Sequence, residues 1–274
     1  MIKYIHDKES IYMSDILKHL RSYNTSFTGD KTQLTNYFYV TDNNELVGYI
    51  ETSLSWDWVS LGDMFYENIE VLRHLLYTVC EKYRNISVGI NIRSTEKTRV
   101  EEFISLGFEL SGIVEGTLKT ENYYYADLLS FDIHSDLNLD VIMREEMIEK
   151  FDEILREKNK IYNKKDNLSR ESEDYMIVAL DNDVFVGGVQ GVITEDSMNI
   201  HLLVVNEEYR NRDIGTKLMT LIEDVAVRKD IAKIYLGTVE FQARSFYEKL
   251  GYKVVMTRKN VPKGYDSYKL VKLI

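Results

Sequence analysis

The C-terminal half of the chain is a succession of short apolar runs whose spacing alternates between the period of a strand and that of a helix. Residues 175–181 and 184–194 flank an Asp/Asn turn, which predicts a hairpin, and residues 198–205 predict a third strand. The other predicted elements are helices at about 141–163, 214–229 and 242–250, and strands at 232–238, 252–257 and 266–273. This order predicts an α+β fold, in which helices cover the faces of a mixed, mostly antiparallel sheet.

The helix expected at 214–229 has the clearest pattern. Leu218, Leu221, Ile222, Val225 and Ala226 recur at the spacing that places side chains on one stripe of a helix. We expect this stripe to pack on the sheet.

The pattern occurs twice along the chain. The repeated segments are residues 37–50 with 175–189, and residues 100–108 with 244–252. Gly48 and Gly187 are then equivalent at an offset of 139 residues, and Gly107 and Gly251 at an offset of 144. In the second pair an amphipathic helix ends at the glycine, where left-handed backbone angles cost little. Two matches in the same order predict a duplicated unit of about 135 residues, an ordinary domain size.

We place the domain boundary near residues 135–140, which gives domains 1–136 and 137–274. Pro262 is the only proline and no Gly/Ser tract occurs. The two domains are therefore expected to pack together without a flexible linker.

Composition limits the class of protein. The 274 residues are 44% hydrophobic and 29% charged, as in ordinary globular proteins. No apolar run is long enough to span a bilayer, and the N-terminus lacks the layout of a signal peptide. Cys80 is the single cysteine, so no internal disulfide and no cysteine-based zinc site is expected. We expect a cytoplasmic protein, without membrane attachment, that is a monomer or a homodimer.

The formal net charge of −11 argues against nucleic acid as a partner, because phosphate binding requires a basic face. Most of this charge lies in residues 1–140, which hold 12 Lys and Arg against 22 Asp and Glu. Two interpretations remain open. The acidic residues form a solvated surface, or they form a wall that attracts a cationic ligand.

Residues 200–219 carry the candidate chemistry. They predict a buried strand, then a polar loop with Arg210, Arg212 and Gly215, then a helix. The free backbone N–H groups of a first helical turn, together with the helix dipole, form an anion site. A diphosphate fits such a site.

This loop resembles the Arg/Gln-x-x-Gly-x-Gly/Ala pattern of the GNAT superfamily of acetyl-CoA-dependent N-acetyltransferases. Residues 241–252 are similar to the Ala-x-x-Phe-Tyr-x-x-x-Gly-Phe/Tyr pattern of that superfamily, and residues 261–268 more weakly to a Pro-x-Gly-His-x-x-Tyr motif. The resemblance covers the C-terminal half. It implies acetyl-CoA as co-substrate, no metal, and a small-molecule primary amine, cationic in the second interpretation of the charge, as acceptor.

The resemblance also implies roles for individual residues. The loop Arg210, Asn211, Arg212, Asp213, Ile214, Gly215 and Thr216 would hold the coenzyme A diphosphate, and Leu203, Val204 and Val205 would end the strand that pairs with the pantetheine arm. Tyr247 matches the frequent general acid of the superfamily, which protonates the departing thiolate. It is also expected to bind the cofactor.

Two residues depart from the family pattern. Asp213 replaces the first loop glycine; Asp tolerates left-handed backbone angles, but its charge costs about 1 kcal/mol against each phosphate charge at roughly 7 Å and an effective dielectric near 40. Glu240 replaces a frequent asparagine. We expect weakened binding of acetyl-CoA.

The N-terminal half keeps the pattern of elements but lacks the arginine pair, the loop glycine and the phenol, since Phe103 and Ile104 replace Phe and Tyr. We interpret it as a degenerate GNAT-like domain that does not bind acetyl-CoA. It would shape the acceptor pocket, through Trp56, Trp58 and acidic residues, or only stabilise its partner domain.

A general base is not evident from the sequence. The candidates near strand ends are Glu195, Asp196, Glu240 and Asp266. His201 is expected to be a buried histidine satisfied by the backbone, or a proton relay. Cys80 lies in a helical apolar stripe and is expected in the core.

Three functions stay open. The first is acetyl transfer to a small amine, with antibiotics, polyamines, amino acids and peptide N-termini as candidate acceptors. The second is a non-catalytic protein that binds coenzyme A for sensing or interaction, with a decayed site. The third is a nucleotide-binding protein that uses the same anion loop, although no motif that reads a base or a ribose accompanies it.

Overall fold

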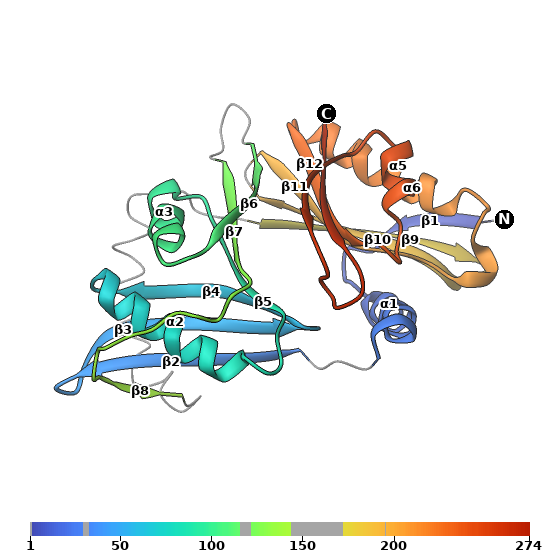
Figure 1. Ribbon diagram of the computed structural model, residues 1–274. Helices are drawn as coiled ribbons and strands as arrows, with labels where there is room; N and C mark the ends of the chain where they lie inside the picture. Colours follow the sequence, from blue (N-terminus) through green and yellow to red (C-terminus); the bar gives the residue numbers. More distant parts are fainter. Residues whose placement is uncertain (1, 30–32, 116–121, 144–171, 195) are drawn as a thin grey trace.

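The computed structural model describes residues 2–29, 33–115, 122–143, 172–194 and 196–274 (Figure 1). All described strands belong to one 14-stranded sheet, with helices packed on its faces. The second part of the chain contains β9 (Ser172–Asp181), β10 (Val184–Thr194), β11 (Ser197–Val205), η1 (Glu207–Tyr209), α5 (Ile214–Arg228), β12 (Lys233–Val239), α6 (Arg244–Lys249), β13 (Lys253–Arg258) and β14 (Ser267–Leu273). The strands and helices predicted between residues 175 and 273 are confirmed, with ends shifted by at most three residues.

The first part of the chain contains β1 (Ile2–His6), α1 (Met13–Thr28), β2 (Leu34–Asp42), β3 (Glu45–Ser55), β4 (Trp58–Tyr66), α2 (Ile69–Tyr83), β5 (Gly89–Ser94), α3 (Lys97–Ser105), β6 (Glu109–Val114), β7 (Tyr123–Leu128) and β8 (Asp140–Ile142). Its strands from β2 to β7 pair in the same manner as β9 to β14. In both sets the first three strands form antiparallel neighbours, the third pairs in parallel with the fourth, and the last strand inserts beside the fourth.

The glycines and turns that suggested a repeat occupy matching places in the two sets. Gly48 lies opposite Val40, and Gly187 lies opposite Ala179, each next to a shift in strand register. Gly107 and Gly251 both have positive φ, 100° and 91°, directly after a helix. The left-handed helix ends predicted for these two glycines are therefore confirmed.

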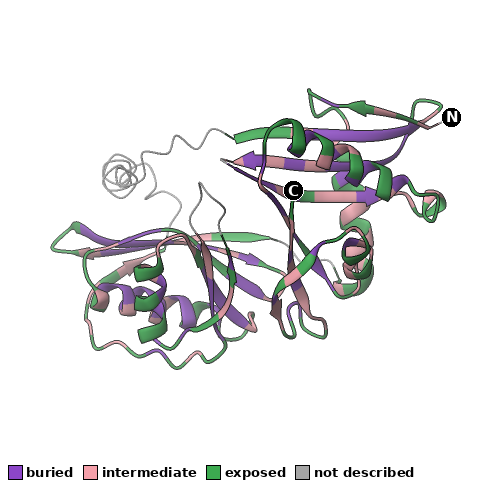
Figure 2. Cartoon of the chain, turned by 90° about the horizontal axis from the view of Figure 1, so that it is seen from above, coloured by how far each residue is buried: buried purple, intermediate pink, exposed green. Residues whose placement is uncertain are grey.

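The two sets of strands meet where β6 pairs with β13. The pair in register is Gly112 with Met256, and a Cβ atom on Gly112 would lie 2.6 Å from Cγ of Met256. A side chain at position 112 would therefore collide with the neighbouring strand. The pairing of β6 with β13 makes the sheet continuous from one half of the molecule to the other (Figure 2).

The N-terminal segment packs against the second half of the molecule. β1 pairs antiparallel with β9, and Ile16 of α1 is fully buried against the β9–β11 face. Conversely, β8 pairs with β2 in the first half. The prediction of a helix beginning at about residue 141 is wrong at its start, because residues 140–142 form this strand; residues 144–163 lie outside the described residues. By packing, residues 2–29 belong with the second half, although the predicted sequence boundary lies near 135–140.

Each half has its own core beneath its long helix. In the first, α2 buries Leu72, Leu75, Leu76, Val79 and Cys80 against the strands. Cys80 is a core residue as predicted, and burial raises the pKa of its thiol to about 12. In the second, α5 buries Leu218, Ile222, Val225 and Ala226 of the predicted stripe, while Leu221 is half-buried. No helix among the described residues is long and apolar enough to cross a membrane.

Candidate active site

The parallel strands β11 and β12 separate part-way along their length. They pair from Ser197 with Lys233 to Ile200 with Leu236, and β11 then continues to Val205 and β12 to Val239. Backbone N–H and C=O groups of the two strands therefore face a gap beyond Ile200. Such groups readily pair with an extended, amide-containing ligand.

A bulge in β11 lies at the start of this gap. On β10, Gly191 pairs with Ile200 and Gln190 pairs with Leu202, so His201 is the extra residue. A bulge bends its strand and ends regular pairing, which explains why β11 leaves β12 here. The bulge could not be predicted from the sequence, because the alternation of apolar residues continues through His201.

A cleft of about 820 Å³ occupies the gap. Its walls come from β11, β12, β14, the 209–216 loop and α6, with Trp56 from the β3–β4 turn and α1 residues from the N-terminal segment. The predicted cofactor residues that line it are Leu203, Val204, Val205, Arg210, Asn211, Asp213, Ile214, Gly215, Thr216 and Tyr247. One cleft thus unites residues that are far apart in the sequence.

The N-terminus of α5 opens onto this cleft without a capping side chain. Its N-cap residue, Asp213, has left-handed angles (φ 57°, ψ 10°) and makes no side-chain cap hydrogen bond. Asn211 also has a positive φ of 60°. The prediction that Asp213 preserves the turn is confirmed, and the first-turn N–H groups of Ile214, Gly215 and Thr216 are left for a ligand.

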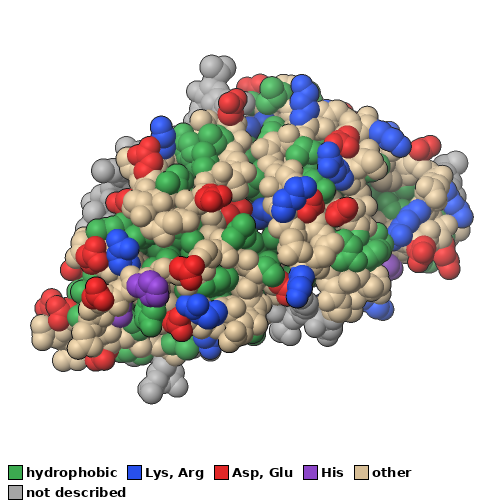
Figure 3. All heavy atoms as spheres, in the orientation of Figure 1, with side chains coloured by type: hydrophobic (Ala, Val, Ile, Leu, Met, Phe, Trp, Pro, Cys, Tyr) green, Lys and Arg blue, Asp and Glu red, His purple; other side chains and the backbone are tan. Residues whose placement is uncertain are grey.

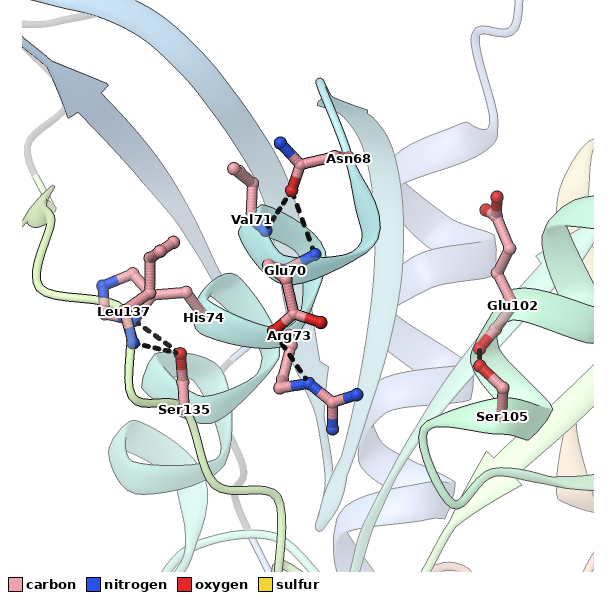
Figure 4. A network of polar contacts seen from close by, with 9 residues as sticks. All are labelled: Asn68, Glu70, Val71, Arg73, His74, Glu102, Ser105, Ser135 and Leu137. Atoms are coloured by element: carbon pink, nitrogen blue, oxygen red, sulfur yellow. Dashed lines mark hydrogen bonds and ion pairs between the residues drawn. The ribbon is translucent and has the colours of Figure 1, made fainter.

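The corresponding helix of the first half has a closed N-terminus (Figure 4). Oδ1 of Asn68 accepts hydrogen bonds from the backbone N–H groups of Glu70 and Val71, each at 3.1 Å. Glu70 also places a carboxylate in the first turn of α2. An anion would have to displace the Asn68 side chain and approach this negative charge.

The two loop arginines lie differently. Nε of Arg210 donates to the carbonyl of Val205 at 3.3 Å, and its guanidinium stands 4.9 Å from the ring centre of Tyr23 on α1. Arg212 is not among the residues that line the cleft; its guanidinium lies over Tyr209, 5.0 Å from the ring centre. Arg210 alone is therefore placed to reach a diphosphate at α5.

Tyr247 of α6 lines the cleft although its side chain is almost fully buried. Its ring packs edge-on against Phe246 and Tyr252. Burial raises the pKa of its phenol well above the usual value of 10. The hydroxyl therefore keeps its proton at neutral pH, which is the protonation state that a general acid needs before the reaction.

Among the predicted general bases that the structure describes, only His201 lines the cleft. It is exposed to the cleft, which corrects the expectation of a buried histidine, and its Nε2 lies 2.8 Å from Nδ2 of Asn199. Desolvation of the imidazole, together with the charges of Lys269 and Arg93, lowers the pKa of His201 against the opposing effect of the Asp174 charge. The imidazole is therefore neutral at pH 7 and can accept a proton.

The carboxylates considered as bases are placed elsewhere. Oε2 of Glu240 accepts from the backbone N–H of Asp266, and Asp266 binds Lys259 and the N–H of Asn260. These contacts fix the loop between β13 and β14. Asp196 is buried outside the cleft, and Glu195 lies outside the described residues.

The structure adds residues that the sequence did not indicate. Lys269, Arg258 and Tyr23 line the cleft from β14, β13 and α1, and each comes from a segment distant from the 200–219 motif. Of the two tryptophans proposed for the acceptor pocket, Trp56 lines the cleft. Trp58 is buried beneath Arg258, with its ring centre 5.1 Å from the guanidinium carbon. Among the described residues, no group of three His, Cys, Asp or Glu side chains could hold a metal ion.

Comparison with known proteins agrees with this site. Residues 140–252 match the model of the family described as "Acetyltransferase (GNAT) family". This segment is a GNAT acetyltransferase domain. The match includes β11, the loop to α5, β12 and α6, which together build the gap and the uncapped helix end.

Solved structures similar to this chain include further acetyltransferases. One is an acetyltransferase from Bacillus cereus, with 28% identity over 45% of this chain and 91% of that chain and a TM-score of 0.41. Another is PaiA N-acetyltransferase from Thermoplasma acidophilum in complex with coenzyme A, with 25% identity over 48% of this chain and 80% of that chain and a TM-score of 0.34. No curated protein matches the chain.

Proposed function

We propose that this protein transfers the acetyl group of acetyl-CoA to a primary amine of a small acceptor. The observation that carries the proposal is the gap between β11 and β12, which ends at the uncapped N-terminus of α5. The pantetheine arm would pair with the exposed edge at Leu203–Val205, and the diphosphate would accept hydrogen bonds from the first turn of α5.

The chemistry requires one proton to leave the amine and one to reach the sulfur. The neutral amine attacks the thioester carbonyl, a C–N bond forms and the C–S bond breaks. The nitrogen then loses a proton, and the thiolate gains one. Tyr247 is the proposed donor, because it lines the cleft and its phenol is protonated at neutral pH. His201, neutral and at the bulge, is the proposed first acceptor of the amine proton, directly or through water.

We propose further that the first half is a degenerate GNAT-like domain. The identical pairing order of β2–β7 and β9–β14 supports this, as does the closure of the α2 N-terminus by Asn68. Its proposed contribution is to the acceptor end of the cleft, where Trp56 lies. The proposed enzyme acts as a monomer or as a homodimer, since every role proposed here is assigned to described residues of one chain.

Calorimetry with acetyl-CoA tests the binding step. The intact protein should bind one molecule per chain, and Arg210→Ala should bind about 3- to 10-fold more weakly, because a charge near the diphosphate is lost. Arg228→Ala, at the opposite end of α5, is the matched control and should bind as the intact protein does. No heat with the intact protein would refute the proposal.

A thiol-release assay with a panel of small amines tests the reaction. Release of coenzyme A that depends on an added amine supports the enzyme. Binding of acetyl-CoA without thiol release for any amine would instead support a non-catalytic, coenzyme A-binding protein. Equal competition by ATP and coenzyme A would favour the nucleotide-binding alternative.

A further inference from the structure

The cleft contains a group of cations on the sheet face that is turned away from α5. Tyr268 and Leu270 of β14 are buried in the core beneath α5. Lys269 between them therefore points to the opposite face, since side chains alternate along a strand. Lys269 and Arg258 both line the cleft. Arg93 of β5 lies close enough to Lys269 for its charge to act on the ammonium group.

These cations have too few anionic partners. Arg258 forms two hydrogen bonds from Nε to the Asp127 carboxylate, at 3.0 and 2.9 Å. Its Nη2 is buried and has no hydrogen-bond partner among the described residues. A buried N–H donor without a partner costs free energy, which a ligand acceptor at this point would recover.

Lys269 and Arg93 have no ion pair with any carboxylate that the structure describes. Arg93 stacks on Tyr123, 5.3 Å from the ring centre, and hydrogen-bonds to Tyr125. Burial, with repulsion from Arg93 and Arg258, lowers the pKa of Lys269 to about 8.

The other titratable groups around Lys269 do not neutralise it. His201 on β11 is neutral at pH 7, because desolvation lowers its pKa. Burial raises the pKa of the Tyr125 phenol, which is therefore uncharged at pH 7. The charge of Asp174 acts on His201 but is not among the influences on Lys269. Among the described residues, Lys269, Arg258 and Arg93 therefore have one carboxylate partner, Asp127, in a chain whose net charge is −11.

The net charge of the whole chain does not describe the charge in the cleft. Figure 3 shows acidic and basic side chains interspersed over one face of the molecule, without a continuous acidic wall on that face. The excess of charge on the described residues in and around the cleft is positive, opposite in sign to the net charge of the chain. It disfavours a purely cationic acceptor such as a polyamine.

We propose that the acceptor amine also carries a carboxylate, which binds to the ammonium group of Lys269 and to the free Nη2 of Arg258. This inference rests on the proposed acetyl transfer and names its substrate class as amino carboxylates. The carboxylate supplies the missing negative charge and accepts the unused hydrogen bonds. Trp56 and Tyr23, which also line the cleft, would contact the apolar part of the acceptor.

Matched substrates test the proposal. Each amino acid is compared with the amine that lacks only its carboxylate, such as alanine with ethylamine and phenylalanine with phenethylamine. We expect kcat/KM to be about 10- to 100-fold higher for the amino acid, as for a charge-assisted hydrogen bond in a buried site. Lys269→Met should abolish this preference by raising KM with kcat little changed. Lys253→Met, an exposed position on β13, should retain it.

A preference for the amines without a carboxylate would overturn the inference and leave acetyl transfer standing. A second experiment applies if acetyl-CoA binds but no amine is acetylated. Calorimetry of the coenzyme A-loaded protein with N-acetyl amino acids and with their amides then tests whether the cleft binds a carboxylate. Tighter binding of the acids that is lost in Lys269→Met supports the carboxylate site; equal or no binding refutes it. Failure of acetyl-CoA to bind would refute the proposed function itself. Calorimetry with acetyl-CoA distinguishes this result from the two outcomes above, in which acetyl-CoA binds.

Discussion

Gly237 and Lys269 are paired neighbours on β12 and β14, and a Cβ atom on Gly237 would lie 3.4 Å from Nζ of Lys269. The absence of a side chain at Gly237 lets the lysine fold back across β12 toward the gap. The relationship places an ammonium group beside the strand edge at which acetyl transfer is proposed. The free-energy cost of burying this ammonium group should be measurable in the free protein, without any ligand.

Lys269→Met should stabilise the free protein at pH 7 by about 1–3 kcal/mol, because the buried ammonium of Lys269 is disfavoured in the folded state. Its folded pKa of about 8 is below the ordinary value of 10.5. The unfolded chain thus binds more protons between pH 8 and 10.5, so the stability of the intact protein rises through this range. The advantage of the variant should be largest below pH 8 and disappear by about pH 10.5.

Urea titrations of both proteins between pH 6.5 and 10.5 measure this difference. Lys253→Met, at an exposed site, should show no such pH-dependent gain. A constant difference between Lys269→Met and the intact protein across the range would mean that Lys269 titrates normally.

Much of the fold could be predicted because its signals are local. The hairpin turns of both halves fall on Asn43, Asn44, Asn182 and Asp183, which all have positive φ. The polar turn residues between apolar runs therefore identified the hairpins correctly. The exchange of β1 and β8 between the halves could not be predicted, because strand pairing between distant segments leaves no local pattern.

Asp213→Gly should tighten the binding of acetyl-CoA by about 3- to 10-fold. Glycine keeps the left-handed conformation at φ 57° and removes a negative charge beside the proposed diphosphate site, a change of about 1 kcal/mol. Asp230→Gly is the matched control, since Asp230 also has a positive φ, 55°, but follows the other end of α5. Calorimetry at low and moderate salt checks both variants, and unchanged or weaker binding in Asp213→Gly would contradict a diphosphate at this helix end.

Tyr247→Phe should lower kcat by about 100-fold and leave the Kd for acetyl-CoA within about twofold, because the hydroxyl acts only when the thiolate leaves. The raised pKa of Tyr247 adds a second expectation. The phenol stays protonated beyond pH 10, so the rate should show no decline from its ionisation up to that pH.

Tyr252→Phe is the control for the loss of a buried phenol. Its ring packs against Tyr247, but its hydroxyl donates to Glu223 at 2.9 Å and does not line the cleft. It should cost about 1 kcal/mol of stability and leave kcat nearly unchanged. Equal losses of kcat in the two variants would assign a packing role to Tyr247.

The site could be predicted only where one segment carries it. The 203–216 stretch joins a strand, a loop and a helix in order, so its residues were recognisable together, apart from Arg212, which turns to Tyr209. Lys269 could not be recognised as a site residue from the sequence. It reaches the gap only because β14 inserts between β12 and β13. Arg93 reaches the same region from the other half of the molecule.

Asn68→Ala should destabilise the protein by about 1 kcal/mol, because the N–H groups of Glu70 and Val71 lose their acceptor. It should not create a second site for acetyl-CoA. Glu70 keeps a negative charge at the opened helix end, and the segment lacks the loop that precedes α5. Calorimetry should therefore still give one acetyl-CoA per chain, and Glu70→Gln, which removes only an exposed pair with Arg73, should change stability little. A stoichiometry of two in Asn68→Ala would show that the cap alone closes the first half to the cofactor, and that the rest of its site is intact.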